Sequence, residues 1–366
     1  MTDIYMREAL ELARKGRGVT SPNPAVGCVV VRDGQVVGRG FHTWEGVDHA
    51  EVLALREAGD AARGSTLYVT LEPCFHQGRT GPCADEVLKA GIRLVVAAAQ
   101  DPNPETSGKS FAKLREAGVE VTVDDSATVE AERLNEAFVH FMRTGRSLVT
   151  IKAALTLDGK IAAPQDNVGW ITSEVARADV QQVRHYSDAI LTGLGTVLED
   201  DCLLTDRSGR KRARPLLRIV LDSQLRIPLQ SKMITSAEGD VLVVGTSAAS
   251  QGRRRTLESA GIQVLIANGP GGRTDPRKVL DFLAKERYLS LMVEAGSKVN
   301  WTMLDTGIAD KVLFYYAPKI LGGLESLPVA GGKGRMRRVD AIQLDRLTVH
   351  TVSKDEFAVE AYVVKP

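Results

Sequence analysis

The feature that most constrains the fold of this 366-residue chain is His49-Ala50-Glu51, followed by Pro73-Cys74 and then by Cys83. The set supplies one imidazole, two thiols and one spare carboxylate. A zinc ion that activates water needs three protein ligands, an open fourth position and a nearby proton carrier. A fold that uses the set this way must bring three separate chain segments to one point.

Each metal-binding side chain is expected at the end of a regular element. Cys74 follows a short strand pattern, and helices are predicted over residues 49–58 and 83–90. His49 and Glu51 can share one ion only around the first helix start, because helix positions i and i+2 point in different directions. The partial positive charge of helix N-termini favours the thiolate form of cysteine.

The residue types also indicate a chemistry. Two thiolates and a neutral imidazole balance the charge of Zn²⁺, and such a metal acidifies water less than a three-histidine site would. Glu51 is therefore predicted to take the proton from water and return it to a leaving amine. Zinc deaminases of bases and nucleotides use such a set, with a glutamate that is not a ligand. Eight residues separate the two cysteines here, where those enzymes usually have two.

A second interpretation is a closed, structural zinc site, which needs a fourth ligand. His76, two residues from Cys74, is the available side chain, and this role competes with a role in substrate binding. Cys28 and Cys202 stand alone and are expected to be small buried apolar groups.

Composition limits the classes of protein. Hydrophobic and charged contents of 43% and 25% are ordinary for a soluble globular protein, and the length predicts two domains. A net charge of +1 means that the chain has no overall positive potential of the kind that attracts nucleic acid. No apolar run is long enough to span a bilayer, and residues 1–15 have the pattern of an amphipathic helix and not of a signal peptide. Four cysteines make no disulfide framework, so a cytoplasmic, reducing compartment is expected.

A domain boundary is expected at residues 144–147, which gives domains over residues 1–145 and 146–366. Both domains alternate strand and helix patterns and are predicted to be α/β; Asp33-Gly34 marks a hairpin turn and Asp48 is placed as an N-cap. Strands are predicted at residues 25–31, 35–40, 65–70, 94–99, 119–123, 148–154, 189–192, 217–221, 241–245, 263–266, 289–294 and 311–316, and helices at residues 49–58, 83–90, 110–117, 130–141, 173–186, 253–260, 276–286 and 298–305.

Four stretches of the first domain resemble the deaminase domain of the bifunctional riboflavin-biosynthesis deaminase/reductases. They are residues 22–27 (PNPAVG), 40–42 (GFH), 49–52 (HAEV) and 70–83 (TLEPCFHQGRTGPC), and the long cysteine spacing belongs to that family. The resemblance implies a cytidine-deaminase-like α/β/α domain in which His49, Cys74 and Cys83 bind one zinc ion and Glu51 is the proton donor. It also implies that the pyrimidine and its ribose phosphate are surrounded by Asn23, His42, His76 and Arg79.

The second domain resembles the reductase domain of the same family, through residues 152–160, 170–173, 196–201, 204–207, 293–296, 317–319 and 322–323. This implies a dihydrofolate-reductase-like fold that uses NADPH. By position, the cofactor would contact Ala154, Trp170, Thr196, Asp200, Ser223 and the stretch beginning at Gly296. The substrate would contact Val168, Arg184, Leu204, Arg207 and Glu294, with Lys152 as a further polar partner. Without the resemblance, Trp170 fits a core position, Asp200 a helix cap and Arg184 a solvated helix face.

The resemblance covers nearly the whole chain and implies a two-step enzyme. The first domain would deaminate 2,5-diamino-6-(5-phosphoribosylamino)pyrimidin-4-one, and the second would reduce the ribosyl to a ribityl chain with NADPH. The family further suggests a homo-oligomer, a dimer or a tetramer, that acts on a small molecule without nucleic-acid or membrane partners. One rival is a single-activity nucleotide deaminase with a degenerate second domain. Another is a non-catalytic protein with a closed zinc site and a nucleotide-sensing domain.

Overall fold

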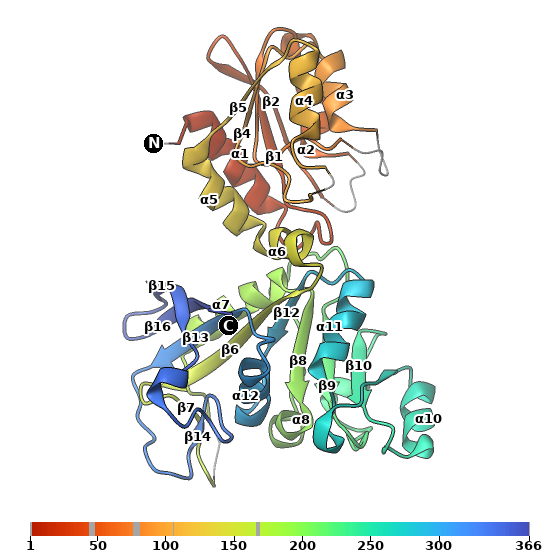
Figure 1. Ribbon diagram of the computed structural model, residues 1–366, viewed down its shortest axis with the longest axis vertical. Helices are drawn as coiled ribbons and strands as arrows, with labels where there is room; N and C mark the ends of the chain where they lie inside the picture. The colour runs from red at the N-terminus through yellow and green to blue at the C-terminus, as the bar shows by residue number, and fades with distance from the viewer. Residues whose placement is uncertain (1, 44–47, 76–80, 105, 166–168, 366) are drawn as a thin grey trace. The chain divides into compact units, whose positions relative to one another are not determined.

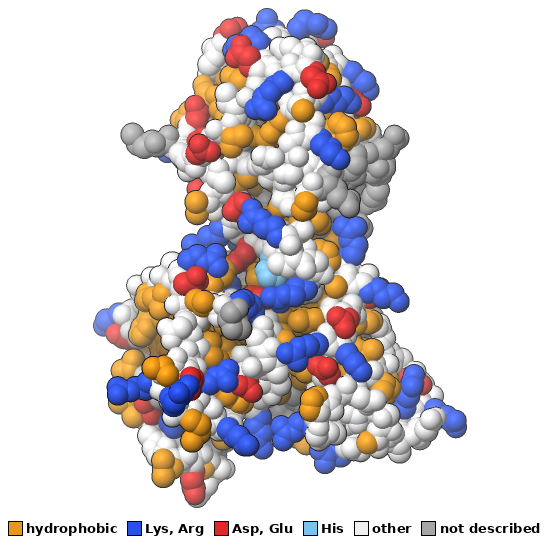
Figure 2. All heavy atoms as spheres, viewed as in Figure 1, with side chains coloured by type: hydrophobic (Ala, Val, Ile, Leu, Met, Phe, Trp, Pro, Cys, Tyr) orange, Lys and Arg blue, Asp and Glu red, His pale blue; other side chains and the backbone are white. Residues whose placement is uncertain are grey.

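The computed structural model describes residues 2–43, 48–75, 81–104, 106–165 and 169–365 (Figure 1). The chain divides into two compact units. The first comprises Met1–Gly145 with Lys211–Arg214, and the second comprises Arg146–Arg210 with Pro215–Pro366. Charged side chains of both signs are interspersed on the visible face of each unit (Figure 2), in keeping with the net charge of +1. No helix in the described ranges has both the length and the apolar character needed to cross a membrane.

The first unit is built on a five-stranded sheet with the order β2-β1-β3-β4-β5. β1 (Gly27–Arg32) and β2 (Gln35–Phe41) form the predicted hairpin, and Asp33 and Gly34 at its turn have φ of 49° and 76°. Such positive values suit a tight two-residue turn. The remaining strands are parallel to one another: β3 (Thr66–Val69), β4 (Leu94–Ala97) and β5 (Glu120–Val123).

Helices cover both faces of this sheet. α1 (Ile4–Lys15) and α5 (Asp125–Leu134) lie on one side, and α2 (Ala50–Ala58), α3 (Cys83–Lys89) and α4 (Lys109–Glu116) lie on the other (Figure 1). Three glycines, Gly27, Gly38 and Gly40, allow the closest approaches between these strands and helices. A Cβ at Gly27 would lie 2.0 Å from the Ala9 carbonyl oxygen, and one at Gly40 would lie 2.1 Å from the Ala50 carbonyl oxygen. The start of α2 is thereby pressed against β2.

Two local predictions for this unit were wrong. His49, and not Asp48, is the N-cap of α2, and the Asp48 carboxylate instead pairs with Arg56 at 2.7 Å. The helix predicted over residues 130–141 is two helices, α5 and α6 (Glu136–Thr144), which meet at Asn135. The Asn135 side chain accepts the Ala25 N–H at 2.8 Å and donates to the Ala25 carbonyl at 2.9 Å. These two hydrogen bonds to a distant residue fix the point at which α5 ends and α6 begins.

The second unit contains a nine-stranded sheet with the order β11-β10-β9-β8-β12-β6-β13-β16-β15. The first seven strands in this order run parallel, and the last two are antiparallel to their neighbours. The strands are β6 (Leu148–Thr156), β8 (Ala189–Gly193), β9 (Leu217–Leu221), β10 (Val241–Gly245), β11 (Gln263–Ile266), β12 (Ser290–Val293), β13 (Lys311–Ala317), β15 (Leu344–Thr351) and β16 (Phe357–Val363). A small separate sheet pairs β7 (Lys160–Ala162) with β14 (Leu327–Pro328).

Side chains of consecutive strand residues in this unit pack into two different apolar clusters, one on each face of the sheet. Ile190 and Val243 belong to one apolar cluster, whereas Leu191 and Val244 belong to the other, so the central strands are buried on both faces. The covering helices are α7 (Glu174–Tyr186), α8 (Leu194–Asp200), α9 (Lys232–Thr235), α10 (Gln251–Ser259), α11 (Pro276–Lys285) and α12 (Ser297–Asp305). The α/β fold predicted for both domains is confirmed.

Candidate active sites

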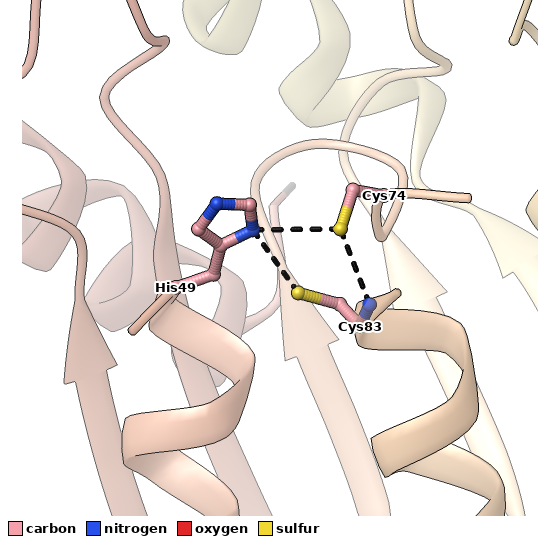
Figure 3. A group of neighbouring side chains, drawn as sticks. All are labelled: His49, Cys74 and Cys83. Atoms are coloured by element: carbon pink, nitrogen blue, oxygen red, sulfur yellow. Dashed lines mark hydrogen bonds between the residues drawn. The ribbon is translucent and has the colours of Figure 1, made fainter. Parts of the chain in front are cut away.

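The first candidate site brings His49, Cys74 and Cys83 together (Figure 3). His49 precedes α2, Cys74 follows β3, and Cys83 is the first residue of α3. The His49 Nδ1 lies 3.1 Å from the Cys83 Sγ and 3.5 Å from the Cys74 Sγ, and one ligand atom from each residue lies within 4.8 Å of the others. Two thiols and one imidazole at this spacing fit a tetrahedral zinc ion with one position left for water.

The start of α3 stabilises a thiolate on Cys74. The Cys83 N–H donates to the Cys74 Sγ at 3.1 Å, as expected for an anion at a helix N-terminus. Hydrogen bonds from Cys83 and then His49 lower the pKa of Cys74 to about 4. The hydrogen bond to the Cys74 thiolate raises the pKa of Cys83. Cys74 therefore already favours the charged form that a metal requires, whereas Cys83 stays a thiol until it binds one.

Glu51 lies in the first turn of α2 and is only 3% exposed. Burial, followed by the negative charge of Cys74, raises the pKa of Glu51 to about 7. A carboxyl group in this range can both accept and donate a proton near neutral pH. Glu51 is not one of the three clustered ligand residues, which leaves its carboxylate available for proton transfer.

Asn23 and His42 lie beside the zinc-site histidine. The Asn23 Nδ2 and the His42 Nε2 are 3.1 Å apart, and the His42 Nδ1 is 3.1 Å from the Asp48 carbonyl oxygen. The rings of His42 and His49 meet edge to face, with centroids 5.0 Å apart. The other two predicted substrate residues of this domain, His76 and Arg79, lie outside the described residues.

Glu72 was missed by the sequence analysis. Its buried carboxylate accepts hydrogen bonds from the backbone N–H groups of Asp101, Gly108, Ser110 and Phe111 and from the Ser110 hydroxyl, at 2.9–3.4 Å. The residue thus joins the segment before Cys74 to the start of α4. The one sequence signal was its place two residues before a metal ligand.

The second candidate site centres on Lys152, Arg184 and Glu294. The Glu294 carboxylate accepts the Arg184 Nε at 2.7 Å and the Arg184 NH2 at 3.0 Å, and the Lys152 Nζ at 2.8 Å. Burial opposes the charge, but Lys152 and Arg184 lower the pKa of Glu294 to about 2. Arg184 is only 8% exposed, so the alternative of a solvated helix face is wrong.

The predicted cofactor residues lie in or beside several strands and helices of the second unit. Gly296 is the N-cap of α12, and a Cβ there would lie 3.9 Å from the Thr196 Oγ1 of α8, so these two helix starts are neighbours. Ala154 is half-buried in β6, Asp200 ends α8, and the Ser223 Oγ accepts the Thr274 N–H at 3.2 Å.

Trp170 is 68% exposed, so its alternative assignment to the core is wrong. The Arg177 guanidinium lies 4.9 Å from its ring centroid, and the Lys319 Nζ donates to its carbonyl at 2.7 Å. Of the predicted substrate residues, Leu204 is buried with a φ of 52°, and Arg207 is exposed. Val168 lies outside the described residues.

These features define a class of protein: a zinc-dependent deaminase domain joined to a reductase domain of dihydrofolate-reductase-like fold. Residues 2–99 match the cytidine and deoxycytidylate deaminase zinc-binding region, and residues 147–355 match the RibD C-terminal domain. The chain belongs to the RibD family of riboflavin biosynthesis proteins. It is a bifunctional enzyme with zinc and NADPH as cofactors, as the resemblance predicted.

The similarity to named relatives extends over nearly the full length. The riboflavin biosynthesis protein RibD of Actinobacillus pleuropneumoniae is 40% identical over 356 residues, which are 97% of this chain and 94% of the relative. RibD of Escherichia coli is 39% identical over 368 residues, or 96% of this chain and 97% of the relative.

Two solved structures have the same architecture. Acinetobacter baumannii RibD superposes with a TM-score of 0.87 at 36% identity, covering 99% of this chain and 98% of that one. A diaminohydroxyphosphoribosylaminopyrimidine deaminase/5-amino-6-(5-phosphoribosylamino)uracil reductase from Thermotoga maritima gives 0.84 at 33% identity, covering 98% of each chain. A degenerate second domain is not favoured, because the family match spans that domain.

Proposed function

We propose that residues 1–145 deaminate 2,5-diamino-6-(5-phosphoribosylamino)pyrimidin-4-one and that residues 146–366 reduce the ribosyl group of the product with NADPH. The observation that carries this proposal is the zinc-type donor set with a buried glutamate beside it, in a chain that is similar to RibD over nearly its whole length. A closed structural site would give no reason to keep a carboxyl of raised pKa next to the ligands.

In the first domain, His49, Cys74 and Cys83 would hold the metal. Zinc bound there would supply Lewis-acid activation of water. Glu51 would take the proton that the attacking water loses and return it to the amino group that leaves as ammonia. The hydrogen bond between Asn23 and His42 fixes two side chains that would orient the pyrimidine, and His76 and Arg79 would complete its surroundings.

In the second domain, NADPH would supply the hydride, and the protein would supply orientation. Ala154, Trp170, Thr196, Asp200, Ser223 and Gly296 are proposed to contact the cofactor. Lys152, Val168, Arg184, Leu204, Arg207 and Glu294 are proposed to contact the substrate. The Lys152 ammonium, held by Glu294, offers a fixed donor to the sugar, and the exposed Arg207 suits the phosphate.

A coupled assay tests the proposal. The purified chain, supplied with the diaminopyrimidine phosphate and NADPH, should release ammonia and oxidise NADPH in equal amounts. Ammonia release without any NADPH oxidation would favour the single-activity rival. Zinc binding with neither reaction would favour the non-catalytic rival.

We also infer a homo-oligomer, a dimer or a tetramer. Every residue of β15 is exposed at the sheet edge, and Leu347 and Val349 are 58% and 59% exposed. An edge strand leaves backbone N–H and C=O groups unpaired, and with exposed apolar side chains beside them it can pair with a further chain. Light scattering after gel filtration tests this, and a monomeric mass would contradict it. The cytoplasm is the proposed compartment, because the zinc-site thiols must stay reduced.

A further inference from the structure

The loop between α8 and β9 holds one residue in an unusual conformation. Leu204 has a φ of 52°, in the left-handed region that residues with a Cβ disfavour, while its side chain is buried in the apolar core. Within the described residues, neither its N–H nor its carbonyl has a hydrogen-bond partner. A strained residue persists only where its surroundings over-determine it, and such residues cluster at ligand sites.

Arg218 of β9 provides one of these constraints. Its guanidinium is 1% exposed and uses all five of its N–H groups. Two bind the Asp240 carboxylate at 2.8 and 2.9 Å, and two bind the Ser236 hydroxyl and carbonyl at 2.9 and 3.0 Å. The fifth donates to the carbonyl of Leu203 at 3.1 Å.

Arg184 provides a similar constraint on the C-terminal side of Leu204. Its NH1 donates to the Thr205 carbonyl at 3.1 Å, while Glu294 anchors the rest of the guanidinium. Two buried arginines, each anchored by a carboxylate, therefore hold the carbonyls on either side of Leu204. The Arg207 N–H is fixed in turn by the Gln181 side chain at 2.8 Å.

We propose that Arg218 is a positioning residue for the reductase substrate. Acting through Leu203, it holds the Leu204 backbone and the following Arg207 in the geometry that binds the phosphorylated sugar. This inference rests on the proposed function of Leu204 and Arg207 as substrate contacts. If Arg218 served only to stabilise the fold, its substitution would lower the fraction of active molecules. That would lower the measured kcat and leave KM unchanged.

Substitution of lysine for Arg218 tests the proposal, because lysine keeps the charge and loses the planar fork. In R218K we expect the KM for the deaminated substrate to rise roughly tenfold, with kcat lowered less than about threefold. Ammonia release from the same chain measures the amount of folded enzyme. The matched control is R253K, since Arg253 donates to two loop carbonyls, those of Leu225 and Ile227, at 2.8 and 2.7 Å. It should leave the substrate KM unchanged.

A fall in kcat with an unchanged KM would overturn the positioning role, and so would wild-type kinetics in R218K. If R218K fails to fold, Asp240→Asn gives the second test, because it retains Arg218 and weakens the carboxylate contact that orients it. An unchanged substrate KM in D240N would also overturn the proposal. Absence of NADPH oxidation by the wild-type chain would overturn the proposed function itself, and this inference with it.

Discussion

At the scale of single residues, both candidate sites depend on buried carboxylates. Glu51 is buried beside the metal ligands, Glu72 is surrounded by backbone N–H donors, and Glu294 lies between two cations. Each has a different environment, and each therefore responds differently to loss of its charge.

Glu72→Gln should weaken zinc binding, because one of the two accepting oxygens becomes an NH2 group, which would face backbone N–H donors and cannot accept from them. Supporting residues of metal ligands typically contribute about 10- to 100-fold to affinity, and we expect zinc loss to a chelator to increase by roughly tenfold. The control is Asp124→Asn, whose side chain caps α5 by accepting the Ser126 N–H, a role that asparagine also fills. Equal zinc loss from wild type and E72Q would contradict the assignment.

Glu294→Gln should destabilise the second unit at neutral pH, because it removes the negative charge that the buried Lys152 and Arg184 both contact. Removing one partner of a buried ion pair typically costs about 3–5 kcal/mol. The wild-type pKa of about 2 lies below the usual value of 4.5, so the stabilisation is complete above pH 4.5 and is lost as pH falls toward 2.

Thermal unfolding of wild type and E294Q should therefore converge as the pH is lowered from 6 to 3. A gap in Tm that stays constant over this range would refute the ion-pair explanation. Glu258→Gln is the control, since the Glu258–Arg254 pair is more than 40% exposed on both sides. It should change stability by less than about 1 kcal/mol at any pH.

At the scale of elements, the position of α2 decides whether the metal ligands meet. Gly40→Ala would place a methyl group 2.1 Å from the Ala50 carbonyl oxygen and push the start of α2 off β2. We expect destabilisation of about 1–3 kcal/mol or more, with loss of zinc and of ammonia release. Reductase activity should remain. Gly252→Ala in α10 is the control, because its Cβ would meet only the Ser250 Oγ, at 3.9 Å; full zinc content in G40A would contradict the argument.

Sequence patterns predicted the elements whose signals are local. Asp33-Gly34 specified a hairpin, and the alternating α/β order followed from apolar strand runs between helix patterns. The break at Asn135 depends on a contact with the distant Ala25 and had no local signal, whereas at the start of α2 the Asp48 carboxylate pairs with Arg56 of the same helix instead of capping it. β15 and β16 were missed, and β15 has no buried residue to give it an apolar alternation.

The metal cluster was predictable because zinc chemistry restricts residue types so strongly. The triad of Lys152, Arg184 and Glu294 came from family resemblance, since single charged residues have no distinguishing pattern. Glu72 and Arg218 were not found at all, because a buried polar network is defined only once the fold assembles it.

At the scale of the whole molecule, the two activities should be separable by metal removal. Dialysis against a chelator should abolish ammonia release, while NADPH oxidation with the deaminated substrate continues, because no residue proposed for hydride transfer is a zinc ligand. Re-addition of zinc should restore ammonia release. Loss of both activities on chelation would contradict the division of labour between the two units.

The most direct test of the account is Glu51→Gln in the full-length chain, with zinc content, ammonia and NADPH measured together. We predict full zinc content, ammonia release lowered by about 100-fold or more, and unchanged NADPH oxidation when the deaminated substrate is supplied. Wild-type ammonia release from zinc-loaded E51Q would contradict the assigned proton carrier, and with it the proposed deaminase mechanism.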